Sequence, residues 1–225
     1  MSDFPVTDRT RVRRLPDRGK YDADTVHRII DAVFVSHVGF TIDERPFVIP
    51  VLHARDGDRL LLHGASSSRL LRHIAAGNPL CVCITAIDGL VLAKTAFNQS
   101  MNYRSVVIFG QGALIDDAEE KLRALAILTN RLVPGQWDHV RHPNPQELKA
   151  TSIVAVPITE ASAKVRSGPP KDDAEDQGFP AWAGVVPITQ LLGAPVPAAY
   201  TDVAATVPDH IRAVVASHAA PPPGA

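Results

Sequence analysis

The sequence lacks an excess of charge of either sign and lacks long apolar runs. Its 225 residues include 23 basic and 24 acidic side chains, which leave a formal net charge of −1. A nucleic-acid or anionic-membrane partner would favour a clear basic excess. No apolar run approaches the roughly 20 residues of a membrane-spanning helix. These absences argue against a nucleic-acid partner and against a membrane partner.

Cysteine is also scarce, with Cys81 and Cys83 as the only two. On a strand both side chains would share one face, too close along the chain for an unstrained disulfide. A metal site would need further soft ligands nearby, and the surrounding sequence offers none. We expect both cysteines to be buried packing residues, because a free cysteine behaves as a small core hydrophobe.

Several motifs that carry chemistry are missing. The nine histidines show no H-x-x-x-H metal spacing, and no G-x-S-x-G nucleophile elbow occurs. Neither glycine-rich phosphate loop, G-x-x-x-x-G-K-[ST] or G-x-G-x-x-G, is present, which argues against P-loop and Rossmann-type nucleotide binding. Arg13-Arg14 resembles part of a twin-arginine export signal, but Leu-Pro-Asp-Arg-Gly follows in place of an apolar region. We therefore expect a cytoplasmic protein.

Short strands dominate what is present. Apolar residues recur at helical spacing over 22–33, in a short helix around Leu70–Ile74 and in a longer one after Asp116-Asp117. Runs rich in β-branched residues at 33–42, 46–54, 59–63, 80–86, 89–97, 103–115, 151–158 and 181–188 are mostly divided by short turns. Turns this short join antiparallel strands. The sequence therefore predicts a mainly β, barrel-like fold of about six or seven antiparallel strands with helical decorations.

The same patterns indicate how the chain is divided. We expect one domain over residues 21–198, preceded by an arginine-rich arm at 1–20. A C-terminal helix and a disordered Ala/Pro tail should follow at 199–225, because the tail has too few apolar side chains to order itself.

The most informative stretch is His63-Gly64-Ala65-Ser66-Ser67-Ser68-Arg69, where a strand leads into a short helix. Backbone N–H groups and the positive dipole end at a helix start form a phosphate site. Ser66 and Ser68 add hydroxyl donors, and Arg69 adds a planar fork that suits phosphate oxygens. The alternative is that the serines only cap the helix, which is their usual role. From the residues alone, both interpretations stand.

A second polar stretch, Phe97 to Ser105, precedes the apolar strand residues that begin at Val106. Polar residues in such a place lie at a barrel mouth or sheet edge, where ligand contacts are common. A solvated turn that leads into the strand is the alternative. His63, at the end of its own strand, is either a general acid or a structural histidine.

Taken in order, the motifs resemble those of the pyridoxamine-phosphate-oxidase-like flavin proteins, in particular their nitroimidazole-resistance branch. The resemblance covers roughly residues 9–197. Its most specific pieces are Ser100–Val106 (Ser-Met-Asn-Tyr-Arg-Ser-Val) and Ser162–Arg166 (Ser-Ala-Lys-Val-Arg). The other matching pieces are Arg11–Arg14, Gly19–Tyr21, Pro46–Pro50, His63–Ala65, Ser68-Arg69, Asp88–Ala93, Glu147–Thr151, Ser167–Pro170 and Trp182–Val185.

The resemblance implies a split β-barrel that binds FMN at the interface of a homodimer. The cofactor-binding residues it implies fall into four groups. The phosphate turn is Gly64, Ser66, Ser68 and Arg69, with His63 beside it. The backbone of Val48, Ile49 and Pro50 would contact the ring edge; Asn102, Tyr103 and Arg104, with Ser105, would face the isoalloxazine; and Lys164, Arg166 and Trp182 would arrive from the partner subunit. Asn98-Gln99 stands where many relatives have His-His, so no role of those histidines transfers to this chain.

The resemblance also implies a function. A flavin carries hydride chemistry, and the protein orients it and tunes its electronics. Arg104 and His63 are the candidate catalytic side chains, Arg104 because it would stabilise negative charge on the ring. We expect an oxidoreductase that reduces a small organic acceptor, nitro-aromatic or quinone-like. The alternatives are a flavin-binding protein without turnover, and a haem-binding or deazaflavin (F420)-binding member of the same fold.

Overall fold

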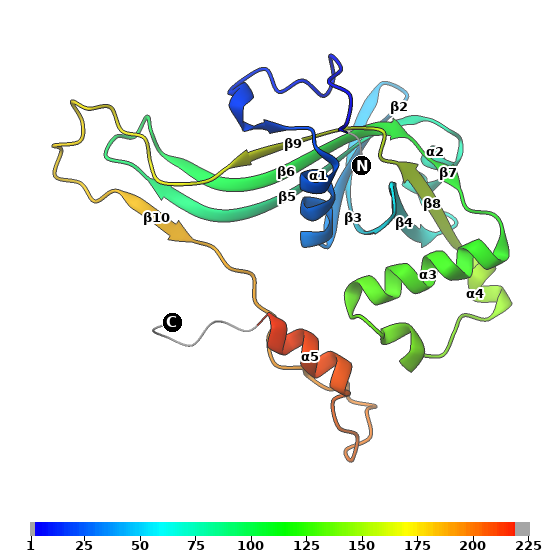
Figure 1. The fold of residues 1–225 in the computed structure, drawn as a ribbon. Coiled ribbons are helices and arrows are strands. Elements are labelled where there is room, and N and C mark those ends of the chain that lie inside the picture. Colours follow the sequence, from blue (N-terminus) through cyan, green and yellow to red (C-terminus); the bar gives the residue numbers. More distant parts are fainter. Residues whose placement is uncertain (1–2, 219–225) are drawn as a thin grey trace.

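The computed structural model describes residues 3–218, and its centre is a ten-stranded antiparallel sheet (Figure 1). The strands follow the order β1-β9-β6-β5-β2-β3-β4-β8-β7, and β10 pairs with the outer part of β5. Their bounds are β1 Gly19–Lys20, β2 Val35–Ile42, β3 Arg45–Asp56, β4 Arg59–Ala65, β5 Pro79–Leu92, β6 Ser100–Gln111, β7 Ala113–Leu114, β8 Thr151–Pro157, β9 Glu160–Arg166 and β10 Gly184–Pro187. The predicted mainly β class is confirmed, with more strands than the six or seven expected.

Two of the longer helices begin at a capping aspartate. The side chain of Asp22 accepts a hydrogen bond from Thr25 N at 2.8 Å, and that of Asp117 accepts one from Glu120 N at 2.8 Å. Each bond satisfies a backbone donor that has no partner within the helix. The helical elements are η1 Pro16–Arg18, α1 Ala23–Ala32, α2 Arg69–Ala75, α3 Ala118–Leu132, η2 Gln136–His139, α4 Pro145–Ala150 and α5 Asp209–Ser217.

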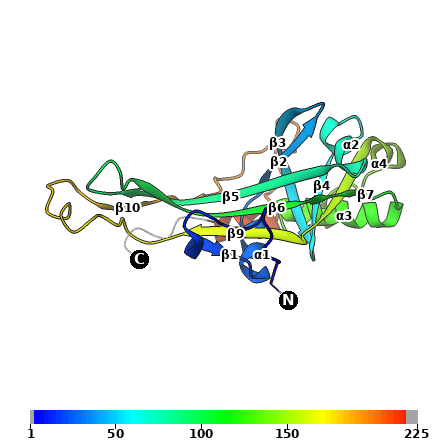
Figure 2. The ribbon, with the colours of Figure 1, turned by 90° about the horizontal axis from the view of Figure 1, so that it is seen from above.

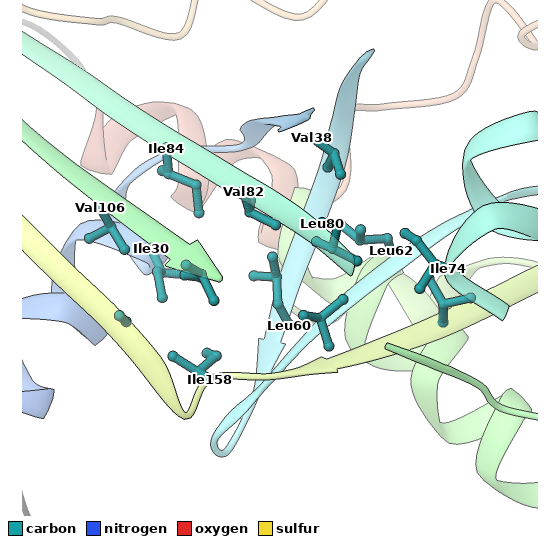
Figure 3. Packing of buried hydrophobic residues seen from close by; sticks show 14 of the residues in the cluster. Ile30, Val38, Leu60, Leu62, Ile74, Leu80, Val82, Ile84, Val106 and Ile158 are labelled. Carbon is teal, nitrogen blue, oxygen red and sulfur yellow. The ribbon is translucent and has the colours of Figure 1, made fainter. Parts of the chain in front are cut away.

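Two apolar clusters hold the sheet together, and β4 contributes to both. Leu60 and Leu62 pack in the larger cluster with side chains from α1, α2 and the strands of the barrel (Figure 3). Leu61 points to the other face and joins the cluster beneath α3, which includes Leu128. Successive side chains of a strand alternate between faces, so one buried strand lines both clusters.

Beyond the core the sheet continues as a projecting arm, which we define as residues 85–105 and 164–187. β5 and β6 form its long hairpin, with β9 beside β6 and β10 beside β5. Figures 1 and 2 show the arm extending away from the end of the molecule that carries α2 and α4. The register of β5 against β6 shifts between Ile87 and Gly89, which marks a β-bulge at Asp88.

The structure corrects several expectations about strands. The two strands predicted at 80–86 and 89–97 are one strand, β5, because the bulge at Asp88 absorbs the extra residue and pairing continues to Leu92. The segment 160–166, predicted only as a motif, forms β9.

The N-terminal arm is packed on the domain, where Thr7 donates a hydrogen bond to Glu160. The predicted disordered tail at 219–225 lies outside the described residues.

The cysteines are half-buried rather than part of the core. Leu80, Val82 and Ile84 take the core face of β5, so Cys81 and Cys83 between them point to the opposite face. Burial nevertheless raises the pKa of the Cys81 thiol above its ordinary value.

Within residues 3–218, none of the helices combines the length and apolar character needed to cross a membrane.

Candidate functional site

The predicted phosphate turn lies where β4 ends and α2 begins. Ser68 is the N-cap of α2 and accepts a hydrogen bond from Leu71 N at 3.4 Å. Ser66 N donates to Ala150 O, and Ser68 N donates to Ala65 O, both at 2.9 Å. Capping therefore accounts for Ser68, and these two backbone donors are already used within the chain.

Gly64 has a packing role in the turn, whereas Arg69 is suited to a ligand. A Cβ at Gly64 would lie 3.2 Å from the Leu71 side chain, so the small residue lets α2 pack closely on β4. The exposed Arg69 guanidinium lies over the Phe47 ring, 4.3 Å from its centroid. None of the ion pairs among residues 3–218 involves Arg69. Its charge is available to an anion.

The residues of β3 that were expected to contact the ring edge lie close to the phosphate turn. Val48, Ile49 and Pro50 follow Phe47 on β3, and Phe47 is the ring that contacts Arg69. We call the residues Val48–Pro50, His63, Gly64, Ser66, Ser68 and Arg69 the turn cluster.

His63 is the titratable group of the turn cluster. Its Nδ1 is buried and has no hydrogen-bond partner in the described protein. Burial lowers the pKa of the imidazole below its ordinary value. A neutral ring is a poor general acid at neutral pH, so this environment favours the structural interpretation of His63 over the catalytic one.

The remaining expected residues lie on the arm, and we call them the arm cluster. Arg104 donates to both carboxylate oxygens of Asp88 at 2.9 and 2.8 Å. The hydrogen bond to Asp88 raises the pKa of Arg104 above its ordinary value. Asp88 lies at the bulge of β5, so the residue at the register shift is the one whose carboxylate pairs with Arg104. The cluster consists of Asn102, Tyr103, Arg104, Ser105, Lys164, Arg166 and Trp182.

Arg166 is a buried cation, and the described hydrogen-bond acceptors that contact its guanidinium are all neutral. It donates to Asn102 Oδ1, to Gly168 O at 3.2 Å and to Pro169 O at 3.2 Å, while its Nε is buried without a partner. Burial, and secondarily the nearby Arg18 charge, lower the pKa of Arg166. In this single copy the guanidinium therefore fixes the segment after β9 to Asn102 of β6.

The other residues of the arm cluster differ in their contacts and in their exposure to solvent. The Ser105 hydroxyl donates to Lys164 O at 3.3 Å, across the β6–β9 pairing. Trp182 is exposed and lies against Gly184, where a Cβ would come within 2.6 Å of the indole. Trp182 is thus held by its neighbour while most of its surface remains open.

One copy of the chain keeps the two clusters apart. Pro50 pairs with His37, and the next two strands in the same row reach Cys83 and then Val107. Tyr103 lies four residues further along β6. At about 4.8 Å per strand and 3.3 Å per residue, Pro50 and Tyr103 are roughly 20 Å apart along the sheet.

A groove of about 1000 Å³ lies beside the arm cluster. Its walls come from the end of α1, the middle of β5, the last turn of α3, the segment 188–192 and α5, and it includes Arg104. On one wall Arg131 donates to Asp31 O at 2.8 Å and to Val33 O at 2.9 Å, and it lies over the Phe34 ring. Burial lowers the pKa of Arg131. No local pattern in the sequence predicts this groove, because the segments that form its walls lie far apart in the chain.

Comparison with known proteins identifies the family. The sequence profile described as pyridoxamine 5'-phosphate oxidase matches residues 22–165. Among curated proteins, none matches the chain.

Solved structures match over most of the chain. The flavocytochrome Anf3 from Azotobacter vinelandii is 39% identical, covers 92% of this chain and 96% of its own, and superposes with a TM-score of 0.87. The FAD and haem binding protein from Mycobacterium smegmatis is 33% identical, with 87% and 96% covered and a TM-score of 0.84.

A third structure is described as a 5-nitroimidazole antibiotic resistance protein, from Bacteroides thetaiotaomicron. It is 22% identical over 65% of this chain and 86% of its own, has a TM-score of 0.56 and shows a likeness of fold alone. The family and the split-barrel class that the motifs indicated are both confirmed. The chain belongs to the pyridoxamine 5'-phosphate oxidase family.

Proposed function

We propose that the chain is a flavin-dependent oxidoreductase that works as a homodimer and that also carries haem. The observation that carries the proposal is the division of the site. An unpaired arginine lies on the turn cluster, and the second basic cluster lies on the arm, roughly 20 Å from β3 along the sheet. A flavin held at its phosphate by one copy then meets the arm cluster of the other copy.

Within the flavin site each cluster has a different task. Arg69, aided by Ser66, would neutralise and orient the phosphate that FMN and FAD share. Arg104 would place positive charge beside the isoalloxazine, with Asp88 fixing its orientation. When bound, the flavin supplies the hydride and electron transfer. The motifs favour FMN, whereas the M. smegmatis structure is named for FAD. Extraction and identification of the bound flavin decides between the two.

Homodimer formation is supported by the surface of the arm. Trp182 is 65% exposed, Ile87 46% and Met101 43%, although all three lie on or beside sheet strands. Large apolar side chains that are exposed on one element are typical of a surface that packs on a partner. A second copy that packs along the arm covers them and brings its own turn cluster to the arm cluster.

Haem enters the proposal through the two most similar structures reported above. Flavocytochrome is the word for a protein that carries a flavin and a haem, and the M. smegmatis protein is named for FAD and haem. Both are more than 30% identical to this chain over most of its length. The groove beside the arm cluster has the volume for a cofactor of that size.

For the reaction we propose reduction of a small organic acceptor, nitro-aromatic or quinone-like, in the cytoplasm. In the arm and turn clusters the described side chains offer cations and hydrogen-bond donors that bind and orient a ligand, and His63 is a poor acid. The acceptor would therefore be one that takes electrons from the flavin without needing a strong protein acid.

Spectra of the purified full-length protein test this function. The expected result is flavin bands in the near-ultraviolet and blue together with a Soret band. NADH or NADPH added under nitrogen should bleach the flavin, and an acceptor should restore the colour. A stable flavin spectrum that neither NADH nor NADPH bleaches would support a flavin-binding protein without turnover. A colourless preparation that binds only F420 would overturn the flavin assignment.

A further inference from the structure

The groove beside the arm is built by the part of the chain that follows the family domain. The family profile ends at residue 165, whereas the segment 188–192 and α5 form one side of the groove. Figure 1 shows α5 set apart from the sheet, after the irregular segment that leads from β10. The two structures named for flavin and haem cover 92% and 87% of this chain, shares too large to leave out residues 166–218. Both structures named for flavin and haem therefore align with part of the chain that follows the family profile.

The lining of the groove suits a large apolar ligand with acidic substituents. Phe34, Leu132, Ile188 and Leu191 supply apolar surface from four different segments. The half-buried Arg131 adds a cation whose known partners are two backbone carbonyls, and none of the described carboxylates forms an ion pair with it. A half-buried cation without a counter-charge is stabilised when an anionic group binds it.

His218 supplies a metal ligand at the edge of the same groove. Its Nδ1 lies 3.0 Å from Val214 O and 3.1 Å from the Ser217 hydroxyl. A carbonyl oxygen only accepts, so Nδ1 carries the proton and donates to it. Nε2 is then the unprotonated nitrogen, and no hydrogen bond to it occurs among the described residues. Histidines that bind metals are usually oriented in this way, with the second nitrogen bonded to a backbone carbonyl.

We propose that this groove is the haem site, that His218 Nε2 is an axial ligand of the iron, and that Arg131 binds a haem carboxylate. The inference rests on the proposed function, because it names the place of one of its two cofactors. Haem iron takes imidazole as an axial ligand in many proteins. Arg104 lines the groove and belongs to the arm cluster, so the haem and flavin sites share one wall.

Of the nine histidines, only His218 lines the groove. His53 Nε2 bonds to Ile30 O at 3.0 Å in the core, and His63 is half-buried on β4. His139 and His210 stack on each other at 4.0 Å, and neither lines the groove. The charged groups that face the groove besides Arg131 are Asp31, paired with Arg55, and Asp88, paired with Arg104.

The test is haem binding by the full-length chain, with ferric haem as the probe. In His218→Ala the affinity for ferric haem should fall at least about tenfold, a loss that metal sites show even on removal of an outer partner. The Soret band and the electron paramagnetic resonance signal should change, and free imidazole should restore them. Arg131→Gln should weaken binding without moving the Soret band, because it does not touch the iron. His142→Ala, an exposed histidine outside the groove, should match the wild type.

Each outcome has a distinct meaning. If the wild type binds haem and His218→Ala keeps the same affinity and spectrum, the site assignment is wrong while the proposed function stands. If the wild type binds flavin but no haem, the haem part of the proposed function fails together with this inference. Flavin content and the melting temperature of His218→Ala show whether the variant is folded, and a folded variant with unchanged haem binding overturns the proposal.

Discussion

Arg69, Arg104 and Arg166 carry the same charge in very different surroundings. Arg69 is exposed on an aromatic ring, Arg104 is paired with a carboxylate, and Arg166 is buried among carbonyl and amide oxygens. An arginine that already has partners must break those contacts before it binds a ligand, whereas an unpaired one need not. Of the three, Arg69 is the one best prepared to bind a phosphate.

Replacement of Arg69 by alanine should selectively weaken binding of phosphate-bearing flavins. A hydrogen bond to a charged group contributes roughly 1.5–3 kcal/mol, and about 1.4 kcal/mol corresponds to a tenfold change in affinity. The dissociation constant for FMN or FAD should therefore rise on the order of 10- to 150-fold, measured by fluorescence quenching. Arg69→Lys should recover only part of the affinity, because lysine lacks the planar fork.

Riboflavin and a neighbouring arginine provide the controls for this prediction. Riboflavin has no phosphate, so Arg69→Ala should change its affinity little. Arg72→Ala removes an exposed arginine from the same helix and should leave both affinities unchanged. Equal losses for riboflavin and the phosphate-bearing flavins would show that the phosphate is bound elsewhere.

At this scale the sequence predicts contacts between near neighbours in the chain better than contacts between distant residues. The Ser68 cap follows from local spacing, because its partner is three residues away. The partners of Arg166 do not, because Asn102 is 64 residues distant and comes into reach only through the β6–β9 pairing. The exposure of Cys81 and Cys83 depends likewise on which face of β5 the core takes.

Among the elements, α3 is attached to the sheet by an ionic cluster centred on Asp56. Arg123 of α3 donates to both Asp56 oxygens at 3.0 and 2.8 Å, and Arg59 of β4 donates to one of them at 2.6 Å. The hydrogen bonds from Arg123, and then from Arg59, lower the pKa of Asp56 to about 2 from an ordinary value of 3.8. The cluster joins the end of β3, the start of β4 and the middle of α3.

The lowered pKa of Asp56 predicts how stability changes in acid. The folded state binds this proton less readily than the unfolded state, so the stabilisation is complete above about pH 4 and is lost as the pH falls towards 2. After allowance for solvent screening we expect it to be on the order of 1–2 kcal/mol. Asp56→Asn should lower the free energy of unfolding at pH 7 and flatten its dependence between pH 4 and 2 in urea titrations.

An exposed aspartate serves as the control for this element. Asp116→Asn lies one residue before the α3 cap and forms none of the ion pairs among the described residues, so it should leave the acid dependence unchanged. If Asp56→Asn shows the same acid dependence as the wild type, other carboxylates determine stability in this range.

Elements bounded by local signals are those that the sequence predicts well. The start of α1 after Asp22 and of α3 after Asp117 follows from caps and apolar spacing. The joining of two expected strands into β5 does not, because a bulge at Asp88 forms only against its partner β6. The groove depends on five segments that meet in space and has no local signal.

At the scale of the whole molecule, the arm predicts association. The native mass by light scattering at micromolar concentration should be twice the chain mass of 24.2 kDa. Replacement of exposed arm residues, as in Leu90→Glu with Met101→Glu, should shift the protein towards monomer and lower flavin content together, because the same surface forms the dimer and the flavin site. Val203→Glu, at a fully exposed position outside the arm, is the matched control. A monomer that retains its flavin would contradict the shared site.

The central claim is that one flavin site takes Arg69 from one copy and Arg104 from the other, and mixed dimers test it most directly. Arg69→Ala and Arg104→Gln chains carrying different tags are co-expressed, and the dimers that contain one of each are purified through both tags. In a two-fold dimer, such a pair has one native site and one site that lacks both arginines. The account predicts about one tightly bound flavin per mixed dimer, while each variant alone binds weakly. Mixed dimers without a tight site would show that both arginines act within one chain and would contradict the account.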